Sequence, residues 1–175
     1  MGFFRNLGEK IDAALSEDEK NELKGREFEK YVAKTLLPKK SFIIEDWTTD
    51  NLNKRNGIYV SSNTNPDFII TDRYTGKKFA IECKYRSEPY QLENSEKFAI
   101  RWSTDEQLSR YKAFEKERQI PIFIVIGCLG TPKKPNVIFA IPLSDLKYPI
   151  VYDSIFEKFA RFADKPFYYR NGLLL

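Results

Sequence analysis

Three charged residues lie within two otherwise apolar segments of this 175-residue chain. The segments are "DFIITD" and "KFAIECKYR", and the charges are Asp67, Glu82 and Lys84. Because side chains alternate along a strand, Glu82 and Lys84 share one face, about 7 Å apart, while Cys83 points to the other. A turn around Gly76 joins the segments into a hairpin, which brings Asp67 within about 5–8 Å of Glu82. We therefore expect two carboxylates and one lysine in one place.

Two carboxylates at this separation repel each other unless a cation lies between them. Their hard oxygen donors suit Mg²⁺ or Mn²⁺, so Asp67 and Glu82 predict a metal site, with Lys84 one step beyond the metal. The alternative is an ordinary solvated strand face with an alternating Glu/Lys pair.

The composition narrows the chemistry that the chain can perform. It has no histidine, which excludes an imidazole base, a histidine-liganded zinc site and a Ser-His-Asp triad. Cys83 and Cys128 lie inside apolar runs, and we expect reduced thiols in a cytoplasmic protein. The formal net charge of +4, from 29 basic and 25 acidic residues, is consistent with a polyanionic partner but does not identify one.

The order of the predicted elements indicates an α/β domain with a central mixed β-sheet flanked by helices. Capping-box patterns that begin at Ser16 and Ser103 predict two helices. The apolar run "IPIFIVIGC", from Ile120, predicts a central strand covered on both faces. Further patterns predict a strand at "NVIFAIP", a short helix at "SIFEKFARF" and a closing hairpin at "PFYYRNGLLL". The longest apolar run is too short to span a membrane.

The charged hairpin resembles the PD-(D/E)XK nuclease superfamily, with "PD" ending at Asp67 and "ExK" running from Glu82 to Lys84. An upstream segment, "GREFEKYVAKTL", resembles the first-helix G-x-x-F-E element of resolvase-like and Mrr-like members. The glutamate of that element faces the metal site in the family, and here it corresponds to Glu29. Three segments in the family's order are more specific than the short motif alone.

A fourth segment lies downstream, where Gln107 and Tyr111 in "QLSRY" resemble the Q-x-x-x-Y element of the RecB-like branch. Residues four apart share a helix face, so both side chains can look toward the same site. Together the four segments imply a restriction-endonuclease-like fold and Mg²⁺- or Mn²⁺-dependent hydrolysis of phosphodiester bonds.

The resemblance also implies a role for each site residue. Lys84 would orient the attacking water or stabilise developing negative charge, and Gln107 would complete the catalytic set. The implied metal ligands are the side chains of Asp67, Glu82 and Glu29 and the backbone carbonyl of Cys83. The expected nucleic-acid contacts are Tyr85, Arg86, Arg101, Trp102 and Tyr111.

We expect one nuclease-like domain over residues 18–175, with its core at about 25–142 and DNA as the substrate of an endonuclease. An amphipathic helix over residues 1–17 would dock on the domain, on a second copy of the chain or on a partner protein. Two other readings stay open: a catalytically inactive module of this fold that binds nucleic acid or a protein partner, and an RNA-directed or accessory subunit.

Overall fold

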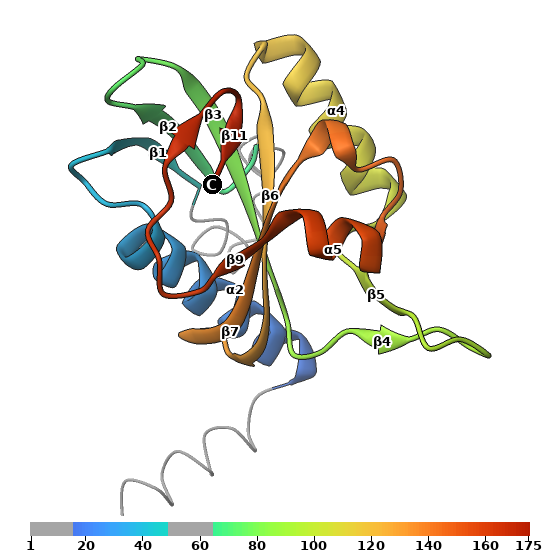
Figure 1. Ribbon diagram of the computed structural model, residues 1–175. Helices are drawn as coiled ribbons and strands as arrows, with labels where there is room; N and C mark the ends of the chain where they lie inside the picture. The colour runs from blue at the N-terminus through green and yellow to red at the C-terminus, as the bar shows by residue number, and fades with distance from the viewer. Residues whose placement is uncertain (1–15, 49–64) are drawn as a thin grey trace, which may run out of the picture.

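The chain folds around a central mixed sheet flanked by helices, which confirms the predicted α/β class (Figure 1). The computed structural model describes residues 16–48 and 65–175. The predicted N-terminal helix falls almost entirely outside the described residues. No helix within them is long and apolar enough to cross a membrane.

The central sheet has six strands in the order β1-β2-β3-β6-β7-β9. Strands β3 and β6 are parallel, and every other neighbouring pair is antiparallel. Strand β6 lies inside the sheet and its first seven residues are buried, as the continuous apolar run predicts. The strands are β1 (Phe42–Trp47), β2 (Phe68–Asp72), β3 (Lys78–Arg86), β6 (Ile122–Thr131), β7 (Lys134–Pro142) and β9 (Ala160–Phe162).

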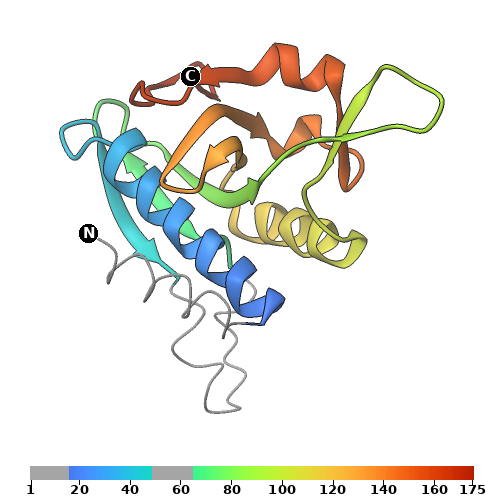
Figure 2. The same ribbon diagram turned by 90° about the horizontal axis from the view of Figure 1, so that it is seen from below.

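Helices cover both faces of this sheet, and Figure 2 shows α2 and α4 on either side of the strands. Helix α4 lies in the crossover that the parallel pair β3 and β6 requires. The helical elements are α2 (Glu17–Tyr31), a π-helical turn η1 (Val32–Leu36), α4 (Asp105–Arg118), a 3₁₀ turn η3 (Leu143–Asp145) and α5 (Asp153–Phe159).

Two small sheets complete the fold. The C-terminal hairpin forms as predicted, with Asn171 and Gly172 at positive φ in its turn. The three-stranded sheet was not predicted, because its segments show no clear period in the sequence. The strands are β4 (Tyr90–Gln91), β5 (Phe98–Arg101), β8 (Ile150–Tyr152), β10 (Tyr169–Arg170) and β11 (Leu173–Leu174).

Both predicted helices begin with a capping box, but the sequence predicted the N-cap residue correctly for only one of them. Ser16 caps α2 as predicted. The prediction that Ser103 caps α4 is wrong by one residue, because Thr104 is the N-cap and Gln107 its capping-box partner. Both pairs have the required spacing, but Ser103 is buried and the chain turns into the helix only after it.

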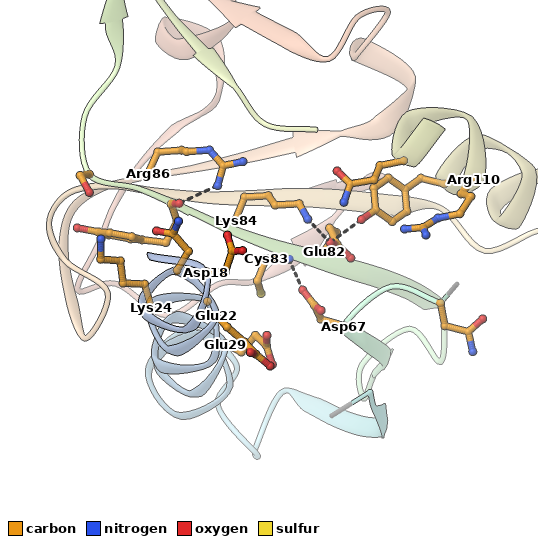
Figure 3. A pocket seen from close by; sticks show the side chains of 17 residues that line it. Asp18, Glu22, Lys24, Glu29, Asp67, Glu82, Cys83, Lys84, Arg86 and Arg110 are labelled. Atoms are coloured by element: carbon orange, nitrogen blue, oxygen red, sulfur yellow. Dashed lines mark hydrogen bonds and ion pairs between the residues drawn. The ribbon is translucent and has the colours of Figure 1, made fainter. Parts of the chain in front are cut away.

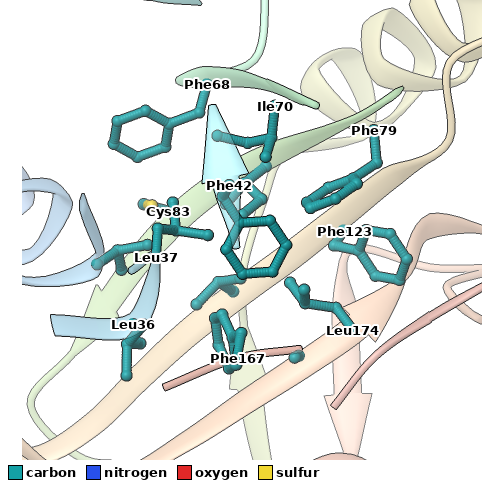
Figure 4. Packing of buried hydrophobic residues seen from close by; sticks show 14 of the residues in the cluster. Leu36, Leu37, Phe42, Phe68, Ile70, Phe79, Cys83, Phe123, Phe167 and Leu174 are labelled. Carbon is teal, nitrogen blue, oxygen red and sulfur yellow. The ribbon is translucent and has the colours of Figure 1, made fainter. Parts of the chain in front are cut away.

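The core divides into one apolar cluster on each face of the sheet. The cluster beneath α2 and the C-terminal hairpin includes three phenylalanines from β2, β3 and β6: Phe68, Phe79 and Phe123 (Figure 4). The cluster beneath α4 includes Trp102 and Tyr111. Successive residues of β3 alternate between these clusters, so this strand carries side chains to both layers.

Helix α2 approaches the sheet closely where Phe28 crosses Gly127 of β6. The Phe28 side chain is fully buried, and a Cβ built on Gly127 would lie 2.3 Å from its ring. Only glycine leaves room for this ring, and the contact sets the height of α2 above the sheet. It therefore also positions Glu29, the next residue along the helix.

We expect Gly127→Ala to destabilise the protein by about 1–3 kcal/mol, because the Phe28 ring must shift away from the new methyl group. Urea unfolding followed by circular dichroism measures this loss. Gly25→Ala is the matched control: it lies inside α2 with nothing within 4 Å of its Cβ, and should gain about 0.5–1 kcal/mol. Equal stability of Gly127→Ala and the parent would contradict the close contact.

Candidate active site

A cavity of about 740 Å³ opens between α2, the end of β3 and the start of α4 (Figure 3). All five residues predicted as catalytic line it, although they come from separate parts of the chain. They are Glu29, Asp67, Glu82, Lys84 and Gln107.

The hairpin of β2 and β3 brings Asp67 beside Glu82. Its register pairs Phe68 with Ile81, so the residues just beyond that pair are neighbours across the two strands. The Cys83 backbone N–H donates a 2.6 Å hydrogen bond to Asp67 Oδ2. This bond holds the aspartate against β3. It uses Oδ2, so Oδ1 can still accept a hydrogen bond or bind a cation.

Glu82 is the centre of the polar network. Lys84 Nζ and the Tyr111 hydroxyl both lie 2.6 Å from Glu82 Oε1. The Glu82 side chain is 6% exposed and the Lys84 side chain 15%, so the ion pair is largely withdrawn from water. A hydrogen-bonded buried pair of this kind is strongly disrupted when one partner is removed.

Burial and mutual repulsion alter the proton affinity of these groups. Burial, then the negative charges of Glu82 and Glu29, raise the pKa of Asp67 well above its usual value. Burial alone would lower the pKa of Lys84, but the attraction of Glu82 and Asp67 outweighs it and raises that pKa. Burial and the Glu82 charge raise the pKa of Tyr111. At neutral pH Lys84 is therefore an ammonium and Tyr111 a hydrogen-bond donor.

Glu29 reaches the cavity from α2, on the other face of the sheet from α4. Trp47 Nε1 donates to its Oε2 at 3.3 Å, and the side chain is half-buried. It is close enough to contribute to the raised pKa of Asp67. The structure thus places Glu29 in the wall of the same cavity as the two hairpin carboxylates.

The carboxylates do not stand in a preformed metal-ligand arrangement. Within residues 16–48 and 65–175, no three acidic, cysteine or histidine side chains are grouped closely enough to hold a metal ion. In this conformation the Lys84 ammonium supplies the positive charge next to Glu82. The donor set nevertheless suits a hard divalent cation, since the site gathers carboxylates whose mutual repulsion a cation would relieve.

The prediction that Trp102 and Tyr111 contact nucleic acid is wrong, because both side chains are buried. Trp102 is fully buried, its Nε1 donates to the Tyr148 carbonyl, and its ring stacks on Tyr111 at 6.1 Å. It cannot stack on a base, and it supports Tyr111 instead. Tyr111 is 2% exposed and its hydroxyl is bonded to Glu82, so it positions that carboxylate rather than contacting a nucleic acid.

The other predicted contacts lie at or near the cavity. Tyr85 lines it, but its hydroxyl donates to the Gly130 carbonyl. Arg86 also lines it and donates to the backbone carbonyls of Tyr85, Arg101 and Trp102. This guanidinium therefore connects β3 to the last residue of β5 and to Trp102, which follows it. Arg101 is exposed and lines a neighbouring groove.

The cavity wall includes charged residues that the sequence reasoning missed. Arg110 of α4 lies 5.9 Å from the Tyr111 ring, and its Nε is buried with no hydrogen-bond partner among the described residues. Lys24 and Glu22 line the cavity from α2. Helical spacing could have found two of them, because Arg110 follows Gln107 by one turn and Glu22 precedes Glu29 by two. Lys24 lies five residues before Glu29 and does not follow this spacing.

Comparison with known proteins identifies no family for the chain. No protein-family model matches it, and no curated protein matches its sequence. Among solved structures, the chain is similar to Hjc, a Holliday junction resolvase from the archaeal hyperthermophile Archaeoglobus fulgidus. The identity is 14%, the match covers 60% of this chain and 75% of that one, and the TM-score is 0.39. A similarity this low carries no argument about function.

The raised pKa of Asp67 predicts a pH-dependent stability. The folded protein binds this proton more tightly than the unfolded chain, so stability falls as pH rises above the ordinary pKa of 3.8. Asp67→Asn removes this loss of stability, because asparagine does not titrate. Its amide oxygen can still accept the hydrogen bond from the Cys83 backbone N–H. In EDTA we therefore expect the variant to melt above the parent at pH 7, because the parent must either bury the charge of Asp67 or hold its carboxyl protonated.

The difference between Asp67→Asn and the parent should shrink toward pH 4, where the carboxyl of the unfolded chain, with its ordinary pKa of 3.8, begins to take up a proton as well. Thermal melts in one buffer series from pH 4 to 8 provide the measurement. A variant that melts below the parent at pH 7 would show that the Asp67 charge stabilises the fold.

Proposed function

We propose that this protein is a metal-dependent nuclease that hydrolyses phosphodiester bonds, with DNA as its substrate and endonucleolytic cleavage as its activity. The observation that carries the proposal is the convergence of Glu29, Asp67, Glu82 and Lys84 on one cavity. These residues come from α2, from the segment before β2, and from β3, and they are the ones that the resemblance to PD-(D/E)XK nucleases selects. The segments that carry them also follow one another along the chain in the order that this resemblance requires.

Asp67 and Glu82 are the proposed metal ligands, with Glu29 and the Cys83 carbonyl completing the set. Asp67 Oδ1 and Glu82 Oε2 accept no hydrogen bond from the described residues, so each carboxylate keeps one oxygen for a cation. A bound Mg²⁺ or Mn²⁺ would supply Lewis acidity, which lowers the pKa of water and offsets negative charge on the phosphate.

Lys84 is suited to electrostatic stabilisation rather than to proton abstraction. Its raised pKa keeps it an ammonium at neutral pH, so it can donate a hydrogen bond but cannot accept a proton. Its bond to Glu82 holds it at the cavity wall, where water is partly excluded. A fixed cation there stabilises negative charge on an attacking oxygen or on the phosphate without reorganisation.

Tyr111 positions Glu82 from the opposite side of the network. Its hydroxyl donates to the same Oε1 that pairs with Lys84, and Trp102 stacks behind its ring. Helix α4 therefore determines how Glu82 is oriented. Gln107 lies one turn earlier, where its side-chain oxygen is used in the capping box, so only its amide nitrogen remains for a substrate.

The experiment that tests the proposal is a cleavage panel in Mg²⁺ and in Mn²⁺ over supercoiled, linear, branched and single-stranded DNA, with RNA included. Metal-dependent cleavage that EDTA abolishes and that Asp67→Ala loses would support the nuclease. Binding of nucleic acid without cleavage of any substrate would favour the inactive binding module instead.

Metal binding should stabilise the folded protein. At a Mn²⁺ concentration of about 100 times the Kd, linkage gives about 2.7 kcal/mol, or roughly 5–10 °C in melting temperature for a chain of this size. Asp67→Asn should lose most of this increase because it removes a ligand charge. Glu157→Gln, an exposed carboxylate on α5, is the matched control and should keep it. No increase for the parent would contradict the metal site.

Lys84→Ala should separate catalysis from metal binding. We expect cleavage to fall by about 10²–10³-fold, the loss usual for one group that stabilises a transition state. Mn²⁺ stabilisation should persist, because removing a cation does not weaken the binding of another. Lys112→Ala, an exposed lysine next to Tyr111, should cleave like the parent. Cleavage by Lys84→Ala at the parent rate would show that the activity comes from elsewhere in the chain.

A further inference from the structure

A second groove, of about 370 Å³, continues from the cavity along the start of helix α4. Arg86 and Gln107 line both, so the two hollows meet at these side chains. The groove is further lined by Arg101 of β5 and by Ser103 and Thr104, which lead into the helix. None of these five residues belongs to the carboxylate cluster.

The groove contains a buried hydroxyl with no partner. Ser103 is 4% exposed, and its Oγ makes no hydrogen bond within the part of the chain that the structure describes. An unsatisfied buried hydroxyl costs about 1–3 kcal/mol, so such a group usually has a ligand or an ordered water. Ser103 lines the groove, so a ligand bound there would lie beside this hydroxyl.

The start of α4 adds further donors at the same place. The capping box uses the N–H groups of Thr104 and Gln107. The N–H groups of Asp105 and Glu106 have no intrahelical acceptor, as is general for the first turn of a helix. A 14-residue helix also carries partial positive charge at this end, which the carboxylates of Asp105 and Glu106 in its first turn partly offset. These features favour a ligand that is an anion with several acceptor oxygens.

Two guanidinium groups line the groove, those of Arg86 and Arg101. Neither Arg86 nor Arg101 forms an ion pair with a carboxylate among the described residues. Arg86 is held by three backbone carbonyls, so its charge is fixed in direction without being neutralised. The opposing charge on the groove wall is Glu88, which is exposed and hence screened by water.

We propose that this groove binds a backbone phosphate of the nucleic-acid strand, one that flanks the phosphate at the carboxylate cluster. The inference rests on the proposed function, because it takes the ligand to be the substrate of that cavity. Tyr90, which lines the groove and is 43% exposed, favours a strand over a free phosphate, since a base can stack on its ring. The groove then determines the direction in which the strand leaves the cleavage site.

The test measures binding of single-stranded and duplex DNA oligonucleotides by fluorescence anisotropy in Ca²⁺ over a range of salt concentrations. Arg101→Glu should weaken binding by about 10-fold and reduce the slope of log K against log salt by about 1, as the loss of one phosphate contact predicts. Arg118→Glu is the matched control: it makes the same charge change at the other end of α4, where the residue is exposed.

Ser103→Ala should weaken binding by about two- to five-fold, while the free variant should melt no lower than the parent because it loses an unsatisfied buried hydroxyl. Glu88→Gln should strengthen binding. Inorganic phosphate should compete only weakly, because it lacks the rest of the strand. If Arg101→Glu and Arg118→Glu have equal affinities and salt slopes, or if Ser103→Ala binds like the parent, the groove is not a phosphate subsite.

These binding results are independent of cleavage. If the parent cleaves no substrate but Arg101→Glu still loses affinity relative to Arg118→Glu, the result supports the phosphate subsite and contradicts the proposed nuclease activity. If the parent cleaves but the two variants bind alike, the result supports the nuclease activity and contradicts the phosphate subsite.

Discussion

The buried charge cluster at the end of β3 is the constraint around which this structure is arranged. Glu82 and Lys84 are withdrawn from water on a strand of the central sheet, and Asp67 lies against the same strand. Such groups are tolerated only when each charge meets a partner at hydrogen-bond distance. The pairing of β2 with β3 brings the Cys83 N–H to Asp67, and helix α4 brings the Tyr111 hydroxyl to Glu82. The cluster therefore depends on both elements.

The surrounding packing maintains that cluster from both faces of the sheet. On one face, the contact between Phe28 and Gly127 holds α2 close to the strands and carries Glu29 to the cavity. On the other, Trp102 stacks on Tyr111, whose hydroxyl orients Glu82. None of these three aromatic residues needs to contact a substrate to affect the chemistry, because each acts through the position of Glu29 or Glu82.

Much of the fold and site could be predicted because the signals are local. The alternation of side chains along β3 places Glu82 and Lys84 on one face, and the hairpin turn places Asp67 beside them. The unbroken apolar run identifies β6 as a buried strand. Each inference uses only backbone geometry and residues close in the sequence. The roles of the site residues came from a resemblance in pattern, and they remain proposals.

The sequence by itself determined which residues are charged, which faces they share and where the central strand lies. Only the tertiary structure decided three other features. They are the hydrogen bond from Tyr111 to Glu82, the burial of Trp102, and the choice of Thr104 rather than Ser103 as the N-cap of α4. The physical reason is the range of the interactions. Strand alternation is a property of the backbone within a few residues, whereas the bond between Tyr111 and Glu82 spans 29 residues and depends on how a helix packs against a sheet.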